Sequence, residues 1–191
     1  MKKDKLFDLW EGRDPFFEKQ YEDAVIKNLC DYGKGTSQYQ ESRGKVLGAG
    51  YESYIMAFFI GLYFDKTLPL EGETKKFGQA IRYWGNQENR RNRKSYHDIT
   101  KFIFVALVAR TEIDWIALDK EETTVRKAVD ALVHKMEEYA NFGYYYMLHE
   151  KLEINPNYFY RNTGFLDIFT SFIKADAAET IEDDDEPDSL D

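Results

Sequence analysis

The chain of 191 residues has few of the residues that build covalent or metal cross-links: one cysteine, three histidines and four prolines. Cys30 alone cannot form an internal disulfide or a cysteine-based zinc site, which favours a reducing compartment. The longest apolar run, Tyr54 to Phe64, has eleven residues, whereas a membrane helix needs roughly 18 to 20. No apolar stretch follows the basic start, Met1 to Lys5, so we expect no signal peptide. These absences predict a cytoplasmic protein without membrane association.

Motifs that would fix a reaction or a cofactor are also missing. Gly33-Lys34-Gly35-Thr36 is not a phosphate-binding loop, because a glycine separates its lysine from its threonine. Gly44, Gly48 and Gly50 do not follow the dinucleotide-binding spacing, and there is no Gly-x-Ser-x-Gly nucleophile elbow. We therefore expect no cofactor and a protein that is not an enzyme, although a small metal-dependent helical enzyme is kept as an alternative.

That enzyme alternative rests on carboxylates close to the three histidines in the sequence. The acids before and after His134 would border one helical face, and several helices could together supply a site of two histidines and one carboxylate. The repeated Glu-x-x-His pairs of helical di-iron proteins are absent. The candidate metal ligands are His97, Asp98, Asp130, His134, Glu138 and His149.

Aromatic residues and acids are what the chain has in abundance. Its 14 Tyr, 14 Phe and 3 Trp, within a hydrophobic fraction of 43%, predict a single folded domain over residues 1–175. Residues 176–191 hold nine of the 35 acids and no base, so we expect a disordered acidic tail. The other 26 acids balance the 26 lysines and arginines, and the net charge of −9 therefore belongs to the tail.

Apolar periodicity predicts an all-α fold, a compact bundle of about six or seven helices followed by the tail. The stretch 33–50, rich in Gly, Ser and Gln, is expected to be a flexible loop. Residues 102–109 could form a buried strand, but the apolar pattern extends helically from Ile99 and favours a helix. The expected helices cover about 15–32, 51–64, 74–84, 95–110, 119–142, 144–152 and 163–175.

Local start and stop signals set these boundaries. Asp14 before Pro15 is typical of a helix N-terminus, because Asp can cap free amides and Pro needs no N–H there. Ser95 with Asp98, and Asp119 with Glu122, have the spacing of capping boxes. Gly143 is expected to separate the long fifth helix from the next one.

A basic segment precedes the fourth expected helix. Residues 75–101 hold eight bases and two acids, and four of the bases lie directly before the proposed cap. A helix N-terminus already carries positive partial charge, so cations there are unfavourable unless an anion binds between them. Neighbouring aromatic rings could stack on such a ligand. The predicted anion-binding residues are Arg90, Arg91, Arg93, Lys94 and Ser95, and the predicted stacking residues are Tyr83, Trp84 and Tyr96.

Three consecutive tyrosines, Tyr144, Tyr145 and Tyr146, form a second unusual cluster. On a helix they point about 100° apart, so they cannot all enter one core. An exposed tyrosine buries a large area on binding and keeps its hydroxyl in water, which is typical of interfaces. The cluster predicts a protein partner or self-association, with a homodimer as the simplest case.

Together these features predict a non-catalytic interaction or accessory protein that binds an anionic partner, either a protein or a nucleic acid. A pI near 5.0 counts against an autonomous DNA-binding protein, whose affinity depends on phosphate neutralisation. The alternative is a nucleic-acid-binding protein in which the tail competes for the basic segment and so regulates binding. The basic loop could also be simply solvated surface.

Overall fold

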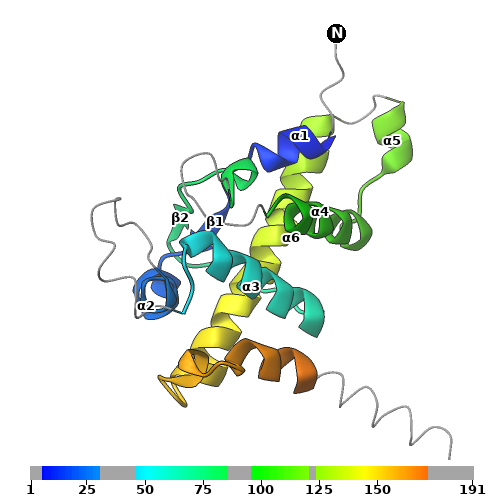
Figure 1. Ribbon diagram of the computed structural model, residues 1–191. Helices are drawn as coiled ribbons and strands as arrows, with labels where there is room; N and C mark the ends of the chain where they lie inside the picture. Colours follow the sequence, from blue (N-terminus) through cyan, green and yellow to red (C-terminus); the bar gives the residue numbers. More distant parts are fainter. Residues whose placement is uncertain (1–5, 31–45, 86–95, 121–123, 172–191) are drawn as a thin grey trace, which may run out of the picture.

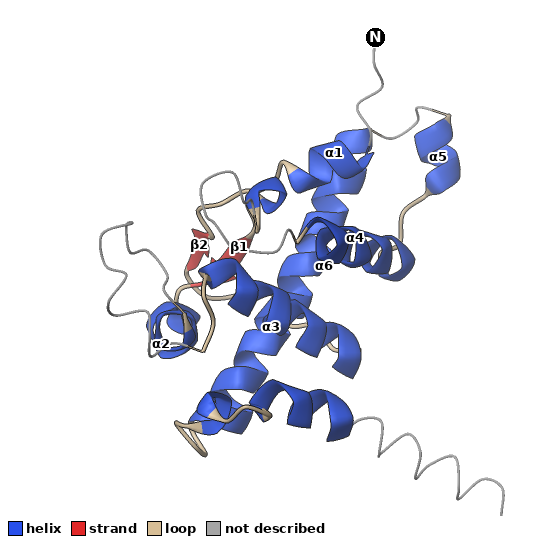
Figure 2. Ribbon diagram, in the orientation of Figure 1, coloured by secondary structure: helices blue, strands red, loops and turns tan. Residues whose placement is uncertain are grey.

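The computed structural model describes residues 6–30, 46–85, 96–120 and 124–171. The protein is mostly helical, as the apolar periodicity predicted, with one small two-stranded sheet (Figure 2). The tail and most of the expected loop over 33–50 lie outside the described residues. In chain order the elements are α1 (Leu6–Glu11), β1 (Phe16–Glu18), the π-helix η1 (Glu22–Ile26), α2 (Lys27–Leu29), α3 (Gly50–Phe64), β2 (Thr74–Lys76), the 3₁₀ helix η3 (Ile81–Tyr83), α4 (His97–Arg110), α5 (Trp115–Asp119), α6 (Val125–Tyr145), the π-helix η4 (Tyr146–Leu152) and the 3₁₀ helix η5 (Tyr158–Tyr160), and residues 164–171 are helical as well.

Helix α6 runs through the molecule, and α3 crosses it (Figure 1). The two backbones touch at the crossing: a β-carbon on Gly143 would overlap the carbonyl oxygen of Ala57, and one on Gly61 would overlap that of Tyr139. The expectation that Gly143 separates two helices is therefore wrong. The helix continues through it into η4, because this glycine permits close approach and does not end the helix.

The residues after Asp14 form a strand, so the first part of the helix expected over about 15–32 is wrong, and its helical elements, η1 and α2, begin at Glu22. Strand β1 pairs antiparallel with β2, with Phe17 opposite Lys75, and this pairing also replaces the first part of the helix expected over 74–84. The Asp14 carboxylate does accept backbone N–H bonds, as a cap would, but from Gly78 at 2.9 Å and not from its own segment. A tertiary contact has overridden the local signal.

The other predicted helices form, with shifted starts. Helix α6 begins after Thr124, whose side chain accepts the N–H of Lys127 at 3.3 Å. The capping box expected at Asp119 is wrong, because Asp119 is the last residue of α5. The predicted apolar stripe of α6 faces inward from its second turn onward, and its buried members are Ala128, Val129, Leu132, Met136 and Tyr139.

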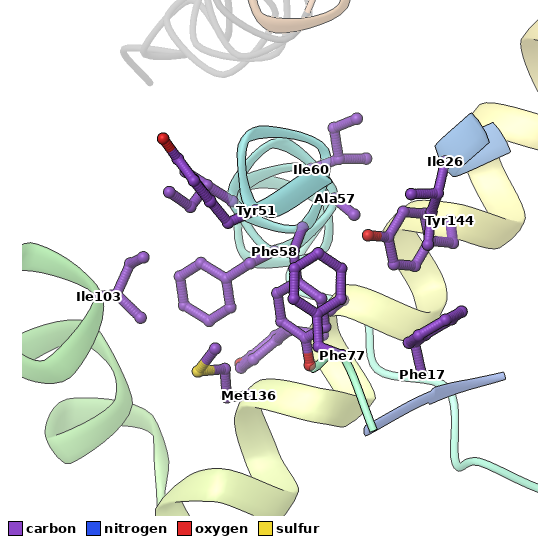
Figure 3. Packing of buried hydrophobic residues seen from close by; sticks show 14 of the residues in the cluster. Phe17, Ile26, Tyr51, Ala57, Phe58, Ile60, Phe77, Ile103, Met136 and Tyr144 are labelled. Carbon is purple, nitrogen blue, oxygen red and sulfur yellow. The ribbon is translucent and has the colours of Figure 1, made fainter. Parts of the chain in front are cut away.

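Aromatic rings build much of the core. Tyr54 of α3 is fully buried, and its ring centroid lies 5.4 Å from that of Phe77 and 6.0 Å from that of Tyr144. Figure 3 shows Phe58, Phe77 and Met136 between α3 and α6. Residues from distant parts of the sequence therefore meet at the crossing of the two longest helices.

Helix α4 forms where helix was favoured over strand, and it lies at the surface although it is apolar on nearly all sides. Ile103 and Leu107 enter the core, whereas Phe102 and Val105 are 69% and 63% exposed. The short α5 follows at the edge of the molecule (Figure 2). Within the described ranges, no helix combines the length and apolarity needed to cross a membrane.

Candidate functional site

The central part of the basic segment, residues 86–95, lies between Gly85 and Tyr96, which are neighbours at the first turn of α4. Gly85 has a φ of +69°, and a β-carbon there would lie 2.8 Å from the backbone nitrogen of Tyr96, so the two residues are in contact. The ten residues between them leave and rejoin the described structure at this contact. The predicted ligands Arg90, Arg91, Arg93 and Lys94 and the predicted cap Ser95 belong to this stretch and lie outside the described residues.

The three aromatic residues beside the segment differ in how much ring they present. Tyr83 is 51% exposed. Trp84 is buried in the core, and its indole nitrogen donates to the carbonyl oxygen of Gln79 at 3.1 Å. Tyr96 is half-buried against Tyr51 in an edge-on contact. Trp84 is therefore a core residue in this structure, and Tyr83 is the residue of the three that offers a stacking face.

The first turn of α4 has no side-chain cap from its N-cap residue, Tyr96. Asp98 lies in this turn, where an acid interacts favourably with the helix dipole, and it pairs with Lys101 at 3.5 Å. The ring of His97 packs at its edge against Phe7, with centroids 6.3 Å apart. The helix start therefore carries one acid of its own beside the basic segment.

Other bases of residues 75–101 are engaged within the fold. Lys75 lies 2.8 Å from the carboxylate of Glu22, and this contact lowers the pKa of Glu22. Arg82 donates to the carbonyl oxygen of Asp8 at 2.8 Å. Lys76 lies over the ring of Phe16, 5.8 Å from its centroid. These contacts hold the sheet and α1 in place.

The three consecutive tyrosines point in different directions, as their spacing predicted. Tyr144 is fully buried, 3.2 Å from the hydroxyl of Ser53. Tyr146 is half-buried, and the ammonium group of Lys151 lies 5.0 Å from its ring centroid. Tyr145 is 40% exposed. Tyr144 therefore belongs to the core, and Tyr145 is the member that presents most surface.

Tyr145 and His149 line an open cleft of about 700 Å³, opposite the loop of residues 68–73. Glu18 lies at this cleft and accepts the backbone N–H groups of Glu71 at 2.8 Å and Gly72 at 3.1 Å. Burial raises the pKa of Glu18, but these bonds and those from the side chains of Gln20 and Asn141 outweigh burial and lower it. Glu18 is thus a buried, ionised carboxylate that fixes the loop to β1.

The candidate metal ligands do not converge. Asp130 pairs with Arg13. His134 lies 3.3 Å from Glu138, one turn away on α6. His149 lies 3.0 Å from Glu153 on its own segment. Over the ranges that the structure describes, no three His, Cys, Asp or Glu side chains are grouped in a way that could hold a metal ion.

Glu137, one of the acids after His134 that were expected to border the polar face of the helix, is buried. It lies at a second cleft, of about 420 Å³, and accepts the backbone N–H of Phe16 at 2.8 Å. Burial raises its pKa, although the N–H of Phe16 and the charges of His134 and Arg13 act in the opposite direction. Its position beside Met136, one turn after Val133, was a signal of burial. Glu137 joins α6 to β1 by accepting a backbone N–H of β1, as Glu18 joins β1 to the loop of residues 68–73 by accepting backbone N–H groups of that loop.

A comparison with models of known protein families finds no match, and searches among curated proteins and solved structures find no significant match either.

Proposed function

We propose that the protein is a non-catalytic interaction protein that binds an anionic partner through Arg90 to Lys94 at the N-terminal end of α4. The observation that supports this most directly is the contact between Gly85 and Tyr96. It brings the two residues that flank 86–95 together at the start of a 14-residue helix, so the four cations are tethered within ten residues of its positive dipole end.

Charge pairing elsewhere supports the same proposal. Three other bases of the basic segment have partners inside the fold: Lys75 contacts Glu22, Arg82 contacts the backbone of Asp8, and Lys101 contacts Asp98. We therefore assign anion binding to Arg90, Arg91, Arg93 and Lys94. An anion bound by the segment would gain charge-assisted hydrogen bonds from three guanidinium groups. The exposed ring of Tyr83 would lie beside it.

The test is a comparison of two triple variants by fluorescence anisotropy. Labelled probes are an acidic peptide, single-stranded DNA, duplex DNA and RNA, each titrated over a salt series. The variant Arg90→Ala/Arg91→Ala/Arg93→Ala should lose at least tenfold in affinity. The control Lys120→Ala/Arg126→Ala/Lys127→Ala removes the same charge from exposed positions and should bind like the wild type.

For duplex DNA the salt slope gives a second readout, because each phosphate contact contributes about 0.9 to it, so the Arg90 triple variant should flatten the slope by about 2.7. The proposal would be refuted if every probe had the same affinity for both triple variants. It would also be refuted if no probe bound to any form of the protein. The probe that binds most tightly identifies the partner as protein or nucleic acid.

The second candidate is a nucleic-acid-binding protein regulated by its own tail, favoured by the nine acids confined to residues 176–191 beside a neutral body. In that case truncation after Ala175 tightens nucleic-acid binding, and the Arg90 triple variant abolishes the gain. The proposed setting is the cytoplasm, because the single cysteine, Cys30, is buried and has no second cysteine for an internal disulfide, which suits a reducing compartment.

A further inference from the structure

The outer face of α4 is an exposed apolar surface. Phe102, Val105 and Ala109 follow the spacing of one helical stripe, and the exposed fractions of Phe102 and Val105 are 69% and 63%. In the next helix, Trp115 and Ile116 are 43% and 67% exposed. Single exposed apolar residues are common, but a run of this kind within fifteen residues marks an interaction surface.

Helix α4 cannot turn this face inward. Its opposite side is anchored in the core by Ile103 and Leu107, both fully buried. The ring of Phe104 packs edge-on against Phe7, with centroids 5.1 Å apart, and its centroid lies 5.4 Å from that of Trp10. Rotating α4 to bury Phe102 would expose these residues instead, so α4 keeps its outer face turned away from the core.

Two acids and two bases lie near the two ends of α4. Asp98 and Lys101 lie at the N-terminal end of α4, and Arg110 and Glu112 at its C-terminal end, all of them exposed. An anionic or a cationic surface would therefore meet repulsion at half of these positions. A second, antiparallel copy of α4 brings the acid at the N-terminal end of one helix, Asp98, close to the base at the C-terminal end of the other, Arg110, so these two positions meet attraction.

We propose that two copies of the chain associate through this face, with their α4 helices antiparallel about a twofold axis. An axis between residues 103 and 104 places Phe102 of each copy opposite Val105 of the other. It also places Asp98 opposite the small Ala109 and next to Arg110 of the second copy, so two equivalent ion pairs flank the apolar contact. A parallel arrangement would bring Asp98 to Asp98 and align the helix dipoles unfavourably.

The proposed interface is small. One helix face per copy belongs to the class of interfaces below about 1,200 Å² in total, which is typical of weak, concentration-dependent complexes. The ion pair of Arg110 with Asp65, at 2.8 Å and exposed on both sides, is of the kind that contributes little and can be exchanged.

Sedimentation equilibrium of the full chain from 1 to 500 µM tests the proposal. The weight-average mass should rise from 22.5 kDa toward twice that value. Val105→Glu should raise the dissociation constant at least tenfold. The matched control is Ile154→Glu, which places the same charge on a side chain that is 74% exposed elsewhere, and it should associate like the wild type.

A charge exchange tests the register. Asp98→Arg and Arg110→Asp should each weaken association, and the double variant should recover at least tenfold over the weaker single variant. Circular dichroism of each variant confirms that the helices are intact. The Arg90 triple variant should dimerise normally, so loss of anion binding and loss of association are separate results.

Three outcomes overturn the proposal. The first is a wild-type mass of 22.5 kDa at every concentration. The second is equal behaviour of Val105→Glu and Ile154→Glu. The third is association that appears only after truncation at Ala175, which would assign the face to the chain's own tail.

Discussion

Replacing Glu18 with Gln removes a buried charge while keeping the shape of the side chain. In the wild type, Oε1 accepts the N–H groups of Glu71 and Gly72 and, at 3.3 Å, the amide of Asn141, while Oε2 accepts the amide of Gln20. Gln keeps one oxygen for the backbone but directs an NH₂ group toward a donor. A hydrogen bond to a charged group contributes about 1.5–3 kcal/mol, so we expect a loss of about 2 kcal/mol in the free energy of unfolding.

For a domain of this size, each kcal/mol lowers Tm by about 2–4 °C, which gives a fall of about 4–8 °C for Glu18→Gln. The assay is urea and thermal unfolding monitored by circular dichroism at pH 7. The control is Glu73→Gln in the same loop, which removes an exposed carboxylate paired with Lys19 and should change stability by less than about 0.5 kcal/mol.

The dependence on pH has a definite sign. The pKa of Glu18 is lower in the folded protein than its ordinary value of 4.5, so ionised Glu18 stabilises the fold above pH 4.5. That contribution is lost as the pH falls below 4.5 through the folded pKa. The gap between wild type and Glu18→Gln should therefore be constant from pH 6 to 8 and shrink in acid. Equal stability at pH 7, or a gap that does not shrink, would refute the reasoning.

Two other substitutions are expected to act in opposite directions. Burial raises the pKa of Glu137, so its ionised form opposes folding once the pH exceeds that pKa. In Glu137→Gln the amide oxygen still accepts the N–H of Phe16, so at pH 7 this variant should be as stable as the wild type, or up to about 1 kcal/mol more stable, in urea unfolding. A marked loss of stability in Glu137→Gln would contradict this expectation. Gly143→Ala should destabilise by about 1–3 kcal/mol in the same assay, because its β-carbon overlaps the carbonyl of Ala57, whereas helix propensity alone predicts a gain of about 1 kcal/mol.

The long helices could be predicted because their signals are local and repeated. The α6 stripe recurs every three or four residues, and the run from Tyr54 to Phe64 is too long for an ordinary strand. The two strands could not be predicted in this way. Each has three residues, and their pairing joins Phe17 to Lys75, so the information lies in a contact between distant segments.

The same reason explains Asp14 and Gly143, whose local meaning was replaced by a tertiary one. Asp14 binds Gly78 instead of starting a helix, and Gly143 accommodates α3 instead of ending α6. For the candidate site, helical geometry predicted that the three consecutive tyrosines cannot all be buried, but neither the exposure of Tyr145 in particular nor the burial of Trp84 could be predicted. The roles of Arg90 to Lys94 remain a proposal that depends on the binding experiment.

The position of α6 in the chain affects how the protein is made. Helix α6 contacts α1, β1, α3 and α4, all of which are synthesised before it. During translation α3, apolar on nearly all sides, leaves the ribosome about sixty residues ahead of the helix that will cover it. Nascent chains that stop before Val125 therefore lack the helix that covers the inner faces of α3 and α4, and exposed apolar surface of this kind makes incomplete domains prone to aggregation.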